Sequence, residues 1–420
     1  MYSGLSLDQA PPISVVMRFF LTMGFFGVAI SALIASDVSA LFGSNHLVLV
    51  HLFFLGIITM AMIGALFQMQ SVLGGKPITS PLIKSTIVHA SLTIGTIALG
   101  AGFYLFEPIY FKIATPFLAI ALGVIVFSIL PLLFQNRAHD TIRGMRLAII
   151  SLALLTLLGL HLAFGYASGS LGAMHNELRT LHYSIALGGW VGILIIAVAF
   201  QVVEMFYVTP PYSTWCKKNA FYVIFISLIA KIVATIASFT YLWIFDLAIL
   251  ALLIGFGVTT LKRLKNKKRH APDSSIWFWM LAIAMLFISI ALSIAAIFTQ
   301  TDIFYTLALI SFGSFALSIV LAMIGKIVPF LVWFHLNSAG YMNTPMMNTI
   351  ITAKQSKVLF LLLVATITTM IAGAFMREIL YITALTNAAL FITLTYNIYN
   401  ALMIYNHTIK TSERFTYTLE

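Results

Sequence analysis

The sequence predicts an all-α integral membrane protein with twelve transmembrane helices. Of its 420 residues, 61% are hydrophobic and only 8% are charged, whereas soluble domains contain about 25% charged residues. Its mean hydropathy is +1.04. Apolar runs of about 18 residues or more, which are long enough to cross about 30 Å of hydrocarbon as a helix, recur along the whole chain. No gap between them has the size of a soluble domain, so residues 1–420 are predicted to form a single membrane domain.

Twelve apolar runs define the predicted spans. They lie near residues 14–36, 46–71, 83–105, 113–134, 145–167, 180–207, 219–238, 241–261, 276–298, 303–334, 357–376 and 379–405. The first run follows the polar leader MYSGLSLDQAPP, which has neither basic residues nor a small-residue cleavage site at the right distance. We therefore expect a retained helix there and not a signal peptide.

The distribution of basic residues predicts the orientation, because Lys and Arg are retained on the cytoplasmic side of a membrane. Odd-numbered loops carry only Lys112, Arg179 and Arg377. Even-numbered loops and the C-terminal tail carry Lys76, Lys84, Arg137, Arg143, Arg146, Lys217, Lys218, KRLKNKKR at 262–269, Lys354, Lys357, Lys410 and Arg414. Both termini are thus predicted to be cytoplasmic, in a membrane of the bacterial inner (plasma) type.

The net charge of +11 follows from this topology. It indicates anionic lipid headgroups as neighbours and argues against nucleic acid binding. The single cysteine, Cys216, excludes an internal disulfide.

Five of the ten histidines fall in one predicted outer layer: His46, His51, His161, His175 and His182. Imidazole is the commonest ligand for metals, and a haem iron needs one or two axial ligands, so this layer is a candidate haem or metal site. The alternative is that these histidines only hydrogen-bond to backbone carbonyls and water. His46 and His51 are five residues apart, about 140° around a helix, so they cannot both face one ligand. His139, His270, His335 and His407 belong to inner loops, to the interface or to the tail.

A second polar layer is predicted on the inner side. It contains Gln68, Gln70, Glu204 and Lys326, with Lys231 deeper, near the middle of the predicted span 219–238. Intramembrane ionisable groups usually point into the bundle and pair. Gln68, Gln201, Glu204, Lys231 and Lys326 are therefore candidates for a proton or ion path. Structural ion pairs or an aqueous pocket are the alternative.

The second, sixth and tenth spans share a weak repeat. Gly56 and FQMQSV at 67–72 correspond to Gly189 and FQVVEMF at 200–206 at an offset of 133, and to Ser314 and GKIVPF at 325–330 at a further offset of 125. Such internal repeats often reflect a symmetric bundle. We expect a pseudo-threefold arrangement of three four-helix units, at about 14–134, 145–261 and 276–405.

The stretches HLVLVHLFFLG at 46–56, GALFQMQSVLGG at 64–75 and LHYSIALGGWVG at 181–192, with the twelve spans, resemble the large subunit (subunit I) of the haem-copper oxidase superfamily. Its C-type oxidases, nitric oxide reductases and NnrS-type haem and copper proteins look most similar. The resemblance implies that His46 or His51 is a haem ligand and that His182 is a copper ligand. His161 is a further haem-ligand candidate, and His175 a further metal-ligand candidate.

The sequence departs from that family in two spans. TDIFYTLALISFGSFALSIVL at 301–321 lacks the histidine pair of the oxidases' tenth span, and FYVIFISLIAKIVATIASF at 221–239 lacks the two further copper ligands of their seventh span. A three-histidine copper site cannot be built in the family's way. The chain is thus not expected to be a complete dioxygen reductase.

Two functions follow as hypotheses. The first is a haem-copper-oxidase-like membrane protein that binds haem b, or a copper or iron ion, near the outer face and acts in respiratory electron transfer, nitric oxide handling or metal handling. If it is an enzyme, it is an oxidoreductase, and its partners are membrane lipid and either other membrane subunits or an electron donor. The second is a cofactor-free transporter or channel for protons, metal ions or small solutes. An assembly subunit is a third option.

Overall fold

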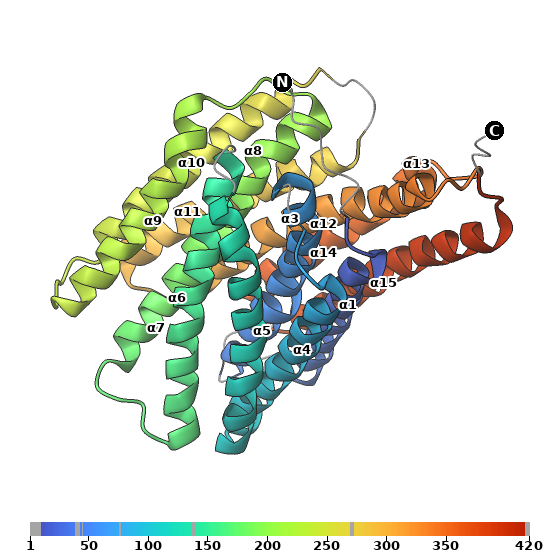
Figure 1. Ribbon diagram of the computed structural model, residues 1–420. Helices are drawn as coiled ribbons and strands as arrows, with labels where there is room; N and C mark the ends of the chain where they lie inside the picture. The colour runs from blue at the N-terminus through green and yellow to red at the C-terminus, as the bar shows by residue number, and fades with distance from the viewer. Residues whose placement is uncertain are drawn as a thin grey trace. The chain divides into compact units, whose positions relative to one another are not determined.

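The computed structural model describes residues 10–37, 43, 45–74, 77–135, 140–268 and 273–415. These residues are almost entirely helical, and the one element of β-structure among them is an isolated bridge between Tyr341 and Arg414. Within the described residues, twelve helical segments are long and apolar enough to cross a membrane (Figure 1). The predicted all-α class and the number of spans are therefore confirmed.

The helices follow the predicted order. They are α1 (Ile13–Ser36), α2 (His46–His51), η2 (Leu52–Thr59), α3 (Met60–Gly74), α4 (Pro81–Leu105), α5 (Pro108–Gln135), α6 (Asp140–Ser168), α7 (His175–Ser184), η3 (Ile185–Gly192), α8 (Ile193–Tyr207), α9 (Thr214–Ile236), α10 (Trp243–Lys265), α11 (Ser275–Thr299), α12 (Asp302–Ser338), α13 (Met347–Ile350), α14 (Ala353–Gly373) and α15 (Ile379–Thr411). The leader up to Gln9, Lys76, Arg137, His139, Arg269 and His270 lie outside the described residues.

Local signals explain several helix starts. Pro81 occupies the first turn of α4, where its missing N–H group leaves no intrahelical bond unmade. Ser213 caps α9 by accepting a hydrogen bond from the Cys216 N–H group. Thr352 and Gln355 form a reciprocal capping box at the start of α14. Each device satisfies, or makes unnecessary, a backbone donor that the first turn of a helix leaves free.

The chain divides into two compact units. Unit 1 comprises Met1–Ala10, Phe67–Ala271 and Ala282–Ala316, and unit 2 comprises Pro11–Leu66, Pro272–Leu281 and Leu317–Glu420. The helices α3, α11 and α12 contribute residues to both units. This division differs from the three predicted repeat units, which stay a prediction.

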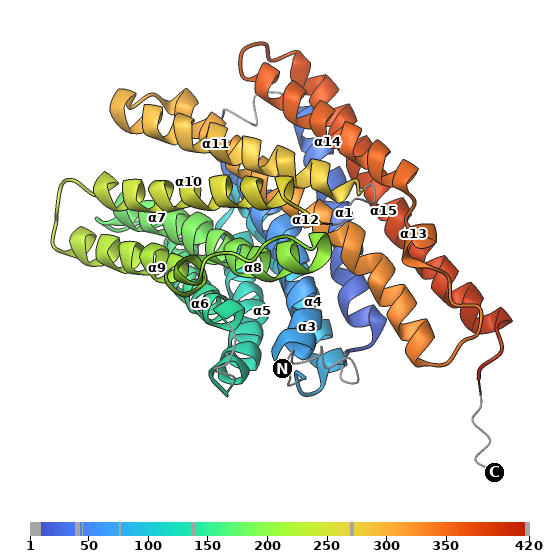
Figure 2. The same cartoon turned by 90° about the horizontal axis from the view of Figure 1, so that it is seen from above.

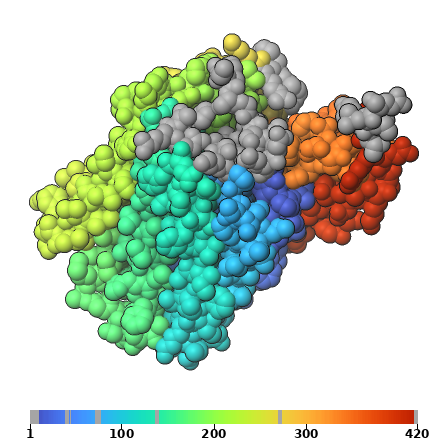
Figure 3. Space-filling model, viewed as in Figure 1, coloured from blue at the N-terminus to red at the C-terminus, as the bar shows by residue number. Residues whose placement is uncertain are grey.

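In unit 1, α4 packs on α5, α5 packs on α6, and α9 packs on α10 (Figures 1 and 2). The surface that α4, α5 and α6 present is seen in cyan to green in Figure 3. Large apolar side chains are exposed on these helices, with Phe127 81% and Leu157 66% exposed. Exposed apolar residues on membrane-length helices are expected to face lipid, where they carry no penalty.

In unit 2, α15 packs against both α1 and α14 (Figure 2). Asn387 of α15 donates hydrogen bonds to the Gly27 carbonyl oxygen at 2.9 Å and to the Ser31 hydroxyl at 2.8 Å. Both partners lie on α1, and the amide is buried. Close packing and interhelical hydrogen bonds are the main forces that join helices in lipid, so this contact fixes the first span against the last.

Helix contacts recur at corresponding places in the predicted repeat. The third and fourth spans of each predicted unit pack together, as α4 with α5, α9 with α10, and α14 with α15. The fourth span also contacts the first span of the next unit: α5 packs on α6, and α15 packs on α1. The third such contact, from α10 to α11, brings Gly257 against the Phe287 ring.

The second and sixth spans share an unusual backbone feature. Each contains an eight-residue π-helix, and η2 and η3 begin at Leu52 and Ile185, 133 residues apart. Each packs on the preceding span, η2 on α1 and η3 on α6. At Gly56 a Cβ atom would collide with the Phe26 ring, and at Gly189 it would lie 2.7 Å from Ser151. The π-helices therefore stand at the offset of the sequence repeat. The tenth span is α-helical throughout as α12.

The packing of α1 on α15 predicts a destabilising variant. At Gly27 an added methyl group would collide with the Phe391 ring, so Gly27→Ala should lower the free energy of unfolding by about 1–3 kcal/mol, as overpacking does. Gly123→Ala is the matched control, because nothing lies within 4 Å of a Cβ atom there. Thermal unfolding in detergent should show a lower midpoint for Gly27→Ala only. Equal midpoints for the two variants would contradict this packing.

Candidate functional site

His51 ends α2, directly before the π-helix η2, and is half-buried. Its Nδ1 atom lies 2.8 Å from the Leu47 carbonyl oxygen. A carbonyl oxygen only accepts hydrogen bonds, so Nδ1 carries the proton, and the lone pair that can bind a metal is on Nε2. Metal-bound histidines usually donate their second ring N–H group in this way. His46, the other candidate on this span, is the first residue of α2.

His182 lies in α7, two residues before the π-helix η3 begins. Its ring rests on Gly159 of α6, where an added Cβ atom would lie 2.8 Å from the His182 Cε1 atom. His161 is also on α6 but is exposed. Because it is two residues and so about 200° from Gly159, it faces away from the side that contacts His182.

His175 starts α7 and contacts the end of α6. Its Nε2 atom lies 3.4 Å from the Tyr166 hydroxyl oxygen, and the two rings meet edge to face at 5.5 Å between centroids. The rings of Phe103 and Phe111 pack on the Tyr166 ring and on each other. His175 thus has an aromatic environment at the helix end.

The structure limits the metal sites that the histidines can form. Among the described residues, no group of three or more His, Cys, Asp or Glu side chains is placed to hold a metal ion. A three-ligand tetrahedral centre would need such a group.

Lys231 forms an ion pair that the sequence reading did not identify. Its Nζ atom donates hydrogen bonds to both Asp246 carboxylate oxygens at 2.7 and 2.8 Å and to the Ser184 hydroxyl at 2.9 Å. The three N–H groups of the ammonium are thereby used. The Lys231 side chain is 2% exposed and that of Asp246 is 32% exposed. The pair joins α7, α9 and α10.

The predicted span of residues 219–238 put Lys231 near the midplane of the membrane, and that depth stays a prediction. The helix α9 begins at Thr214 and ends at Ile236. Lys231 is thus five residues, about 8 Å, from the end that joins α10. Asp246 lies in the first turn of α10, where the helix dipole also favours a negative charge.

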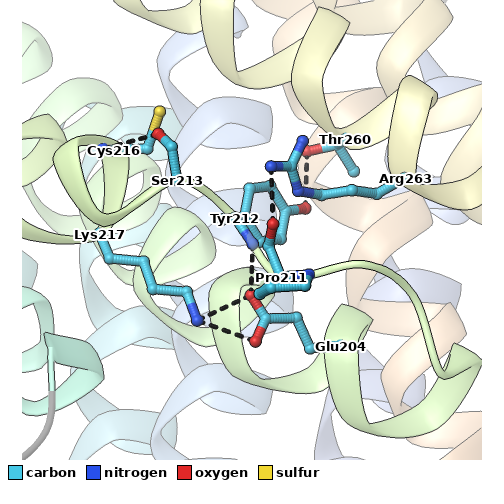
Figure 4. A network of polar contacts seen from close by, with 8 residues as sticks. All are labelled: Glu204, Pro211, Tyr212, Ser213, Cys216, Lys217, Thr260 and Arg263. Atoms are coloured by element: carbon cyan, nitrogen blue, oxygen red, sulfur yellow. Dashed lines mark hydrogen bonds and ion pairs between the residues drawn. The ribbon is translucent and has the colours of Figure 1, made fainter.

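Glu204 belongs to a network that fastens the segment between α8 and α9 (Figure 4). Its carboxylate accepts hydrogen bonds from Lys217 Nζ at 2.8 Å and from the Tyr212 backbone N–H at 2.7 Å. The Arg263 guanidinium lies 4.3 Å from the centre of the Tyr212 ring and donates to the Pro211 carbonyl oxygen at 2.9 Å. These contacts hold the segment against the end of α10.

Tyr212 is the buried centre of this network, and its hydroxyl shares a 2.9 Å hydrogen bond with Thr260 Oγ1. Burial raises the pKa of the Tyr212 phenol well above its ordinary value, and the hydrogen bond with Thr260 only partly opposes this. The phenol, which is neutral at physiological pH as in any tyrosine, acts as a hydrogen-bonding anchor.

Lys326 pairs with Asp273 within unit 2, at 2.6 Å between Nζ and Oδ2. Asp273 also accepts hydrogen bonds from the Ser275 hydroxyl and backbone N–H groups at the start of α11. Burial alone would raise the pKa of Asp273, but the hydrogen bonds from Lys326 and Ser275 outweigh it and hold the pKa below its usual range. Asp273 is thus an ionised cap that is tied to α12.

Gln68 and Gln70 are buried in α3, at 5% and 0% exposure. Their side-chain amide groups have no hydrogen-bond partner among the described residues. Gln201, at the corresponding position in α8, is only half-buried. A buried amide without a partner costs about 1–3 kcal/mol, so water or another polar group is expected to bind Gln68 and Gln70.

The three ionisable candidates are thus each paired, and sequence reasoning missed the partners: Asp246, Ser184, Lys217 and Asp273. The sequence held one signal for Asp246, an acidic residue in the first turn of a predicted span. Nothing in it distinguished Lys217 from Lys218, or joined Asp273 to a lysine 53 residues away.

These features define the chain as a multi-pass, all-α membrane protein with internal ion pairs. No family model matches the sequence, and no curated protein is significantly similar to it. Function must therefore be argued from the residues themselves.

The Lys231–Asp246 pair predicts a strong effect of removing one partner. Asp246→Asn leaves the buried ammonium without its counter-charge and should lower the free energy of unfolding by about 3 kcal/mol. Lys231→Met combined with Asp246→Asn should restore most of it, because the uncompensated charge is gone. Asp302→Asn is the matched control, since Asp302 also lies in the first turn of a spanning helix but is exposed. Equal losses for Asp246→Asn and the double variant, in detergent unfolding curves, would argue against the pair.

The Asp273–Lys326 pair predicts a pH-dependent stability. The pKa of Asp273 is lower in the folded protein than in the unfolded chain. Between these two pKa values the folded state therefore binds fewer protons than the unfolded state. The stabilisation is complete above the unfolded carboxyl pKa of about 4 and is lost as pH falls through the lower folded value. Thermal midpoints of the wild type and of Asp273→Asn should therefore converge at acidic pH. Asp140→Asn, which removes a surface pair with Arg143, should change stability by under about 1 kcal/mol.

Proposed function

We propose that this chain is a bacterial-type inner-membrane protein, with both termini cytoplasmic, built on a scaffold that resembles the haem-copper oxidase large subunit. Three observations support the proposal. The twelve spans agree with that layout, and the two π-helices stand at the offset of the sequence repeat. The packing of fourth spans on first spans recurs, including the last span on the first. Such contacts are expected of three repeated four-helix units.

Within this scaffold, His51 would hold a b-type haem, or a copper or iron ion, near the outer face. The observation that carries this assignment is the hydrogen bond from Nδ1 to the Leu47 carbonyl oxygen, which leaves Nε2 as the basic nitrogen. The adjoining π-helix gives further support, because π-helical turns are frequent at functional sites. His46 lies about 140° away around the helix, so only one of the two faces the group.

The residues fit a group that needs one imidazole. Residues 301–321 contain no histidine, so the second axial ligand that the oxidases take from their tenth span is missing. A haem with one protein ligand would supply one-electron chemistry or bind a small diatomic ligand. The chain's own residues would hold the iron through His51, exclude water with the apolar π-helix η2, and set the imidazole's basicity through Leu47.

His182 is the second candidate ligand, in the equivalent span of the second predicted unit. Its ring is positioned by Gly159, and it lies two residues before its π-helix, whereas His51 lies directly before its own. At the position equivalent to His51, the second predicted repeat unit (residues 145–261) has Ser184, which accepts a hydrogen bond from Lys231. The first two repeat units would thus differ in chemistry, with an imidazole in the first and a hydrogen bond to an ion pair in the second.

The activity that these features support is electron transfer, or the handling of nitric oxide or a metal ion, with an electron donor or another membrane subunit as partner. Complete dioxygen reduction is not proposed, because the seventh span contains no histidine. A proton or ion path is a second candidate function, and one observation favours it. Gln68 and Gln70 present buried amides that need a hydrogen-bonding partner.

The ligand assignment predicts the spectrum of a variant. Wild-type protein purified in detergent should show a reduced-minus-oxidised difference spectrum of haem b, with about one haem per chain by the pyridine haemochrome assay. His51→Ala should abolish the signal, because the iron loses its protein ligand. His46→Ala is the matched control on the same helix and should keep it.

Elemental analysis for iron and copper on the same samples separates a haem from a bare metal ion. Loss of the signal in His46→Ala with retention in His51→Ala would reverse the assignment. A colourless protein that contains neither metal would exclude the redox proposal and leave the polar path, with Gln68→Leu as the next variant.

A further inference from the structure

The helices α9 and α10 form an antiparallel hairpin whose connecting segment spans residues 237–242. The start of α9 and the end of α10 therefore lie at the same end of the hairpin. Two contacts agree with this: Arg263 donates to the Pro211 carbonyl oxygen at 2.9 Å, and the Lys268 N–H group donates to the Val208 carbonyl oxygen at 3.0 Å. Both helices have 23 residues, close to the length that spans a bilayer.

The basic residues that lie within α9 and α10 at this end fall into two groups. Lys217 and Arg263 are half-buried and take part in the network of Figure 4. Lys218, Lys262 and Lys265 are exposed, and none of the ion pairs found among the described residues includes them. Positive charges at one end of a hairpin repel one another, and a nearby anion lowers that repulsion.

The three exposed lysines continue the lipid-facing stripes of their helices. On α9, Trp215, Lys218 and Tyr222 are spaced by three and four residues, and Ile226 lies a further four residues on; Trp215 is 60% exposed and Ile226 is 62% exposed. This is the spacing of one helix face.

The same pattern occurs on α10. Ile254 and Val258 are exposed, and Lys262 and Lys265 follow them at spacings of four and three residues. On α10 the exposed apolar face thus ends in two lysines, and on α9 Lys218 lies between the exposed Trp215 and Tyr222. Lysine stems lie along apolar surface while their ammonium groups reach the headgroup region.

We propose that Lys218, Lys262 and Lys265 form a binding site for the phosphate of an anionic phospholipid headgroup, with the acyl chains along the exposed faces of α9 and α10. Charge complementarity favours a phosphate anion, since basic clusters at the ends of membrane spans attract anionic lipids. The apolar faces below the lysines favour a lipid over free phosphate. Trp215 and Tyr222 mark the interface level, where aromatic rings are enriched. This inference is independent of the proposed redox function.

The test uses the full-length protein, delipidated in a neutral detergent, and its thermal unfolding midpoint. Added phosphatidylglycerol should raise the midpoint, whereas phosphatidylcholine and inorganic phosphate at the same concentration should not. The triple variant Lys218→Gln, Lys262→Gln, Lys265→Gln should need about 100-fold more phosphatidylglycerol for the same shift, at roughly fivefold per lysine. The matching triple Lys→Arg variant should retain the wild-type response.

Lys354→Gln with Lys357→Gln is the matched control, because these lysines are also exposed at the start of a spanning helix. It should keep the wild-type response, which distinguishes a defined site from diffuse attraction to positive charge. An unchanged response in the triple Gln variant would overturn the proposal, and so would an equal loss in the control. A shift caused by inorganic phosphate alone would overturn the lipid assignment. Midpoints measured without lipid verify that every variant folds.

Discussion

A charge inside a membrane-spanning bundle must be neutralised by a nearby partner, because neither lipid nor apolar side chains can solvate it. This constraint decides the arrangement around Lys231, whose ammonium has all three N–H groups in hydrogen bonds to Asp246 and Ser184. The pair links three helices, so their relative rotation within unit 1 is fixed. Lys217 with Glu204 follows the same rule near two helix ends, and Lys326 inside α12 pairs with Asp273 directly before α11. In each case a connecting segment or a helix start is held in place.

The π-helix η3 adjoins the hydrogen-bond network of Lys231, because Ser184 directly precedes it. A π-helix widens the turn and changes the direction in which the preceding side chains point. In the second span the residue directly before the π-helix is His51, and in the sixth it is Ser184. His51 carries a basic ring nitrogen, whereas the Ser184 hydroxyl accepts a hydrogen bond from Lys231. The two spans therefore share a π-helix at the offset of the sequence repeat and differ in the residue directly before it.

The fold class was readily predictable, because hydropathy depends on composition over about 20 residues and needs no knowledge of partners. All twelve predicted spans coincide with helical segments of the described residues, with ends that shift by several residues. The largest shift in α9 is at its start, which lies at Thr214 and not near residue 219. Helix ends depend on caps such as Ser213 with Cys216, and a hydropathy window does not detect a cap.

The candidate site was predictable only in part. The histidines predicted to lie on the outer side were chosen from their order along the chain, and spacing alone left His46 and His51 as equivalent candidates. The hydrogen bond between His51 Nδ1 and the Leu47 carbonyl oxygen depends on side-chain direction, which the sequence does not give. The choice between a conducting path and structural ion pairs for Glu204, Lys231 and Lys326 also required knowledge of their partners.

The sequence by itself determined the membrane class, the number and order of the spans, and the positions of the polar residues along them. These properties follow from the solvation of each segment by lipid or water, which is a local property of the chain. The tertiary structure decided which polar groups meet. Lys231 and Asp246 are 15 residues apart, and Lys326 and Asp273 are 53 residues apart. Such contacts depend on how helices rotate and pack, and hydropathy is the same for every rotation of a helix about its axis.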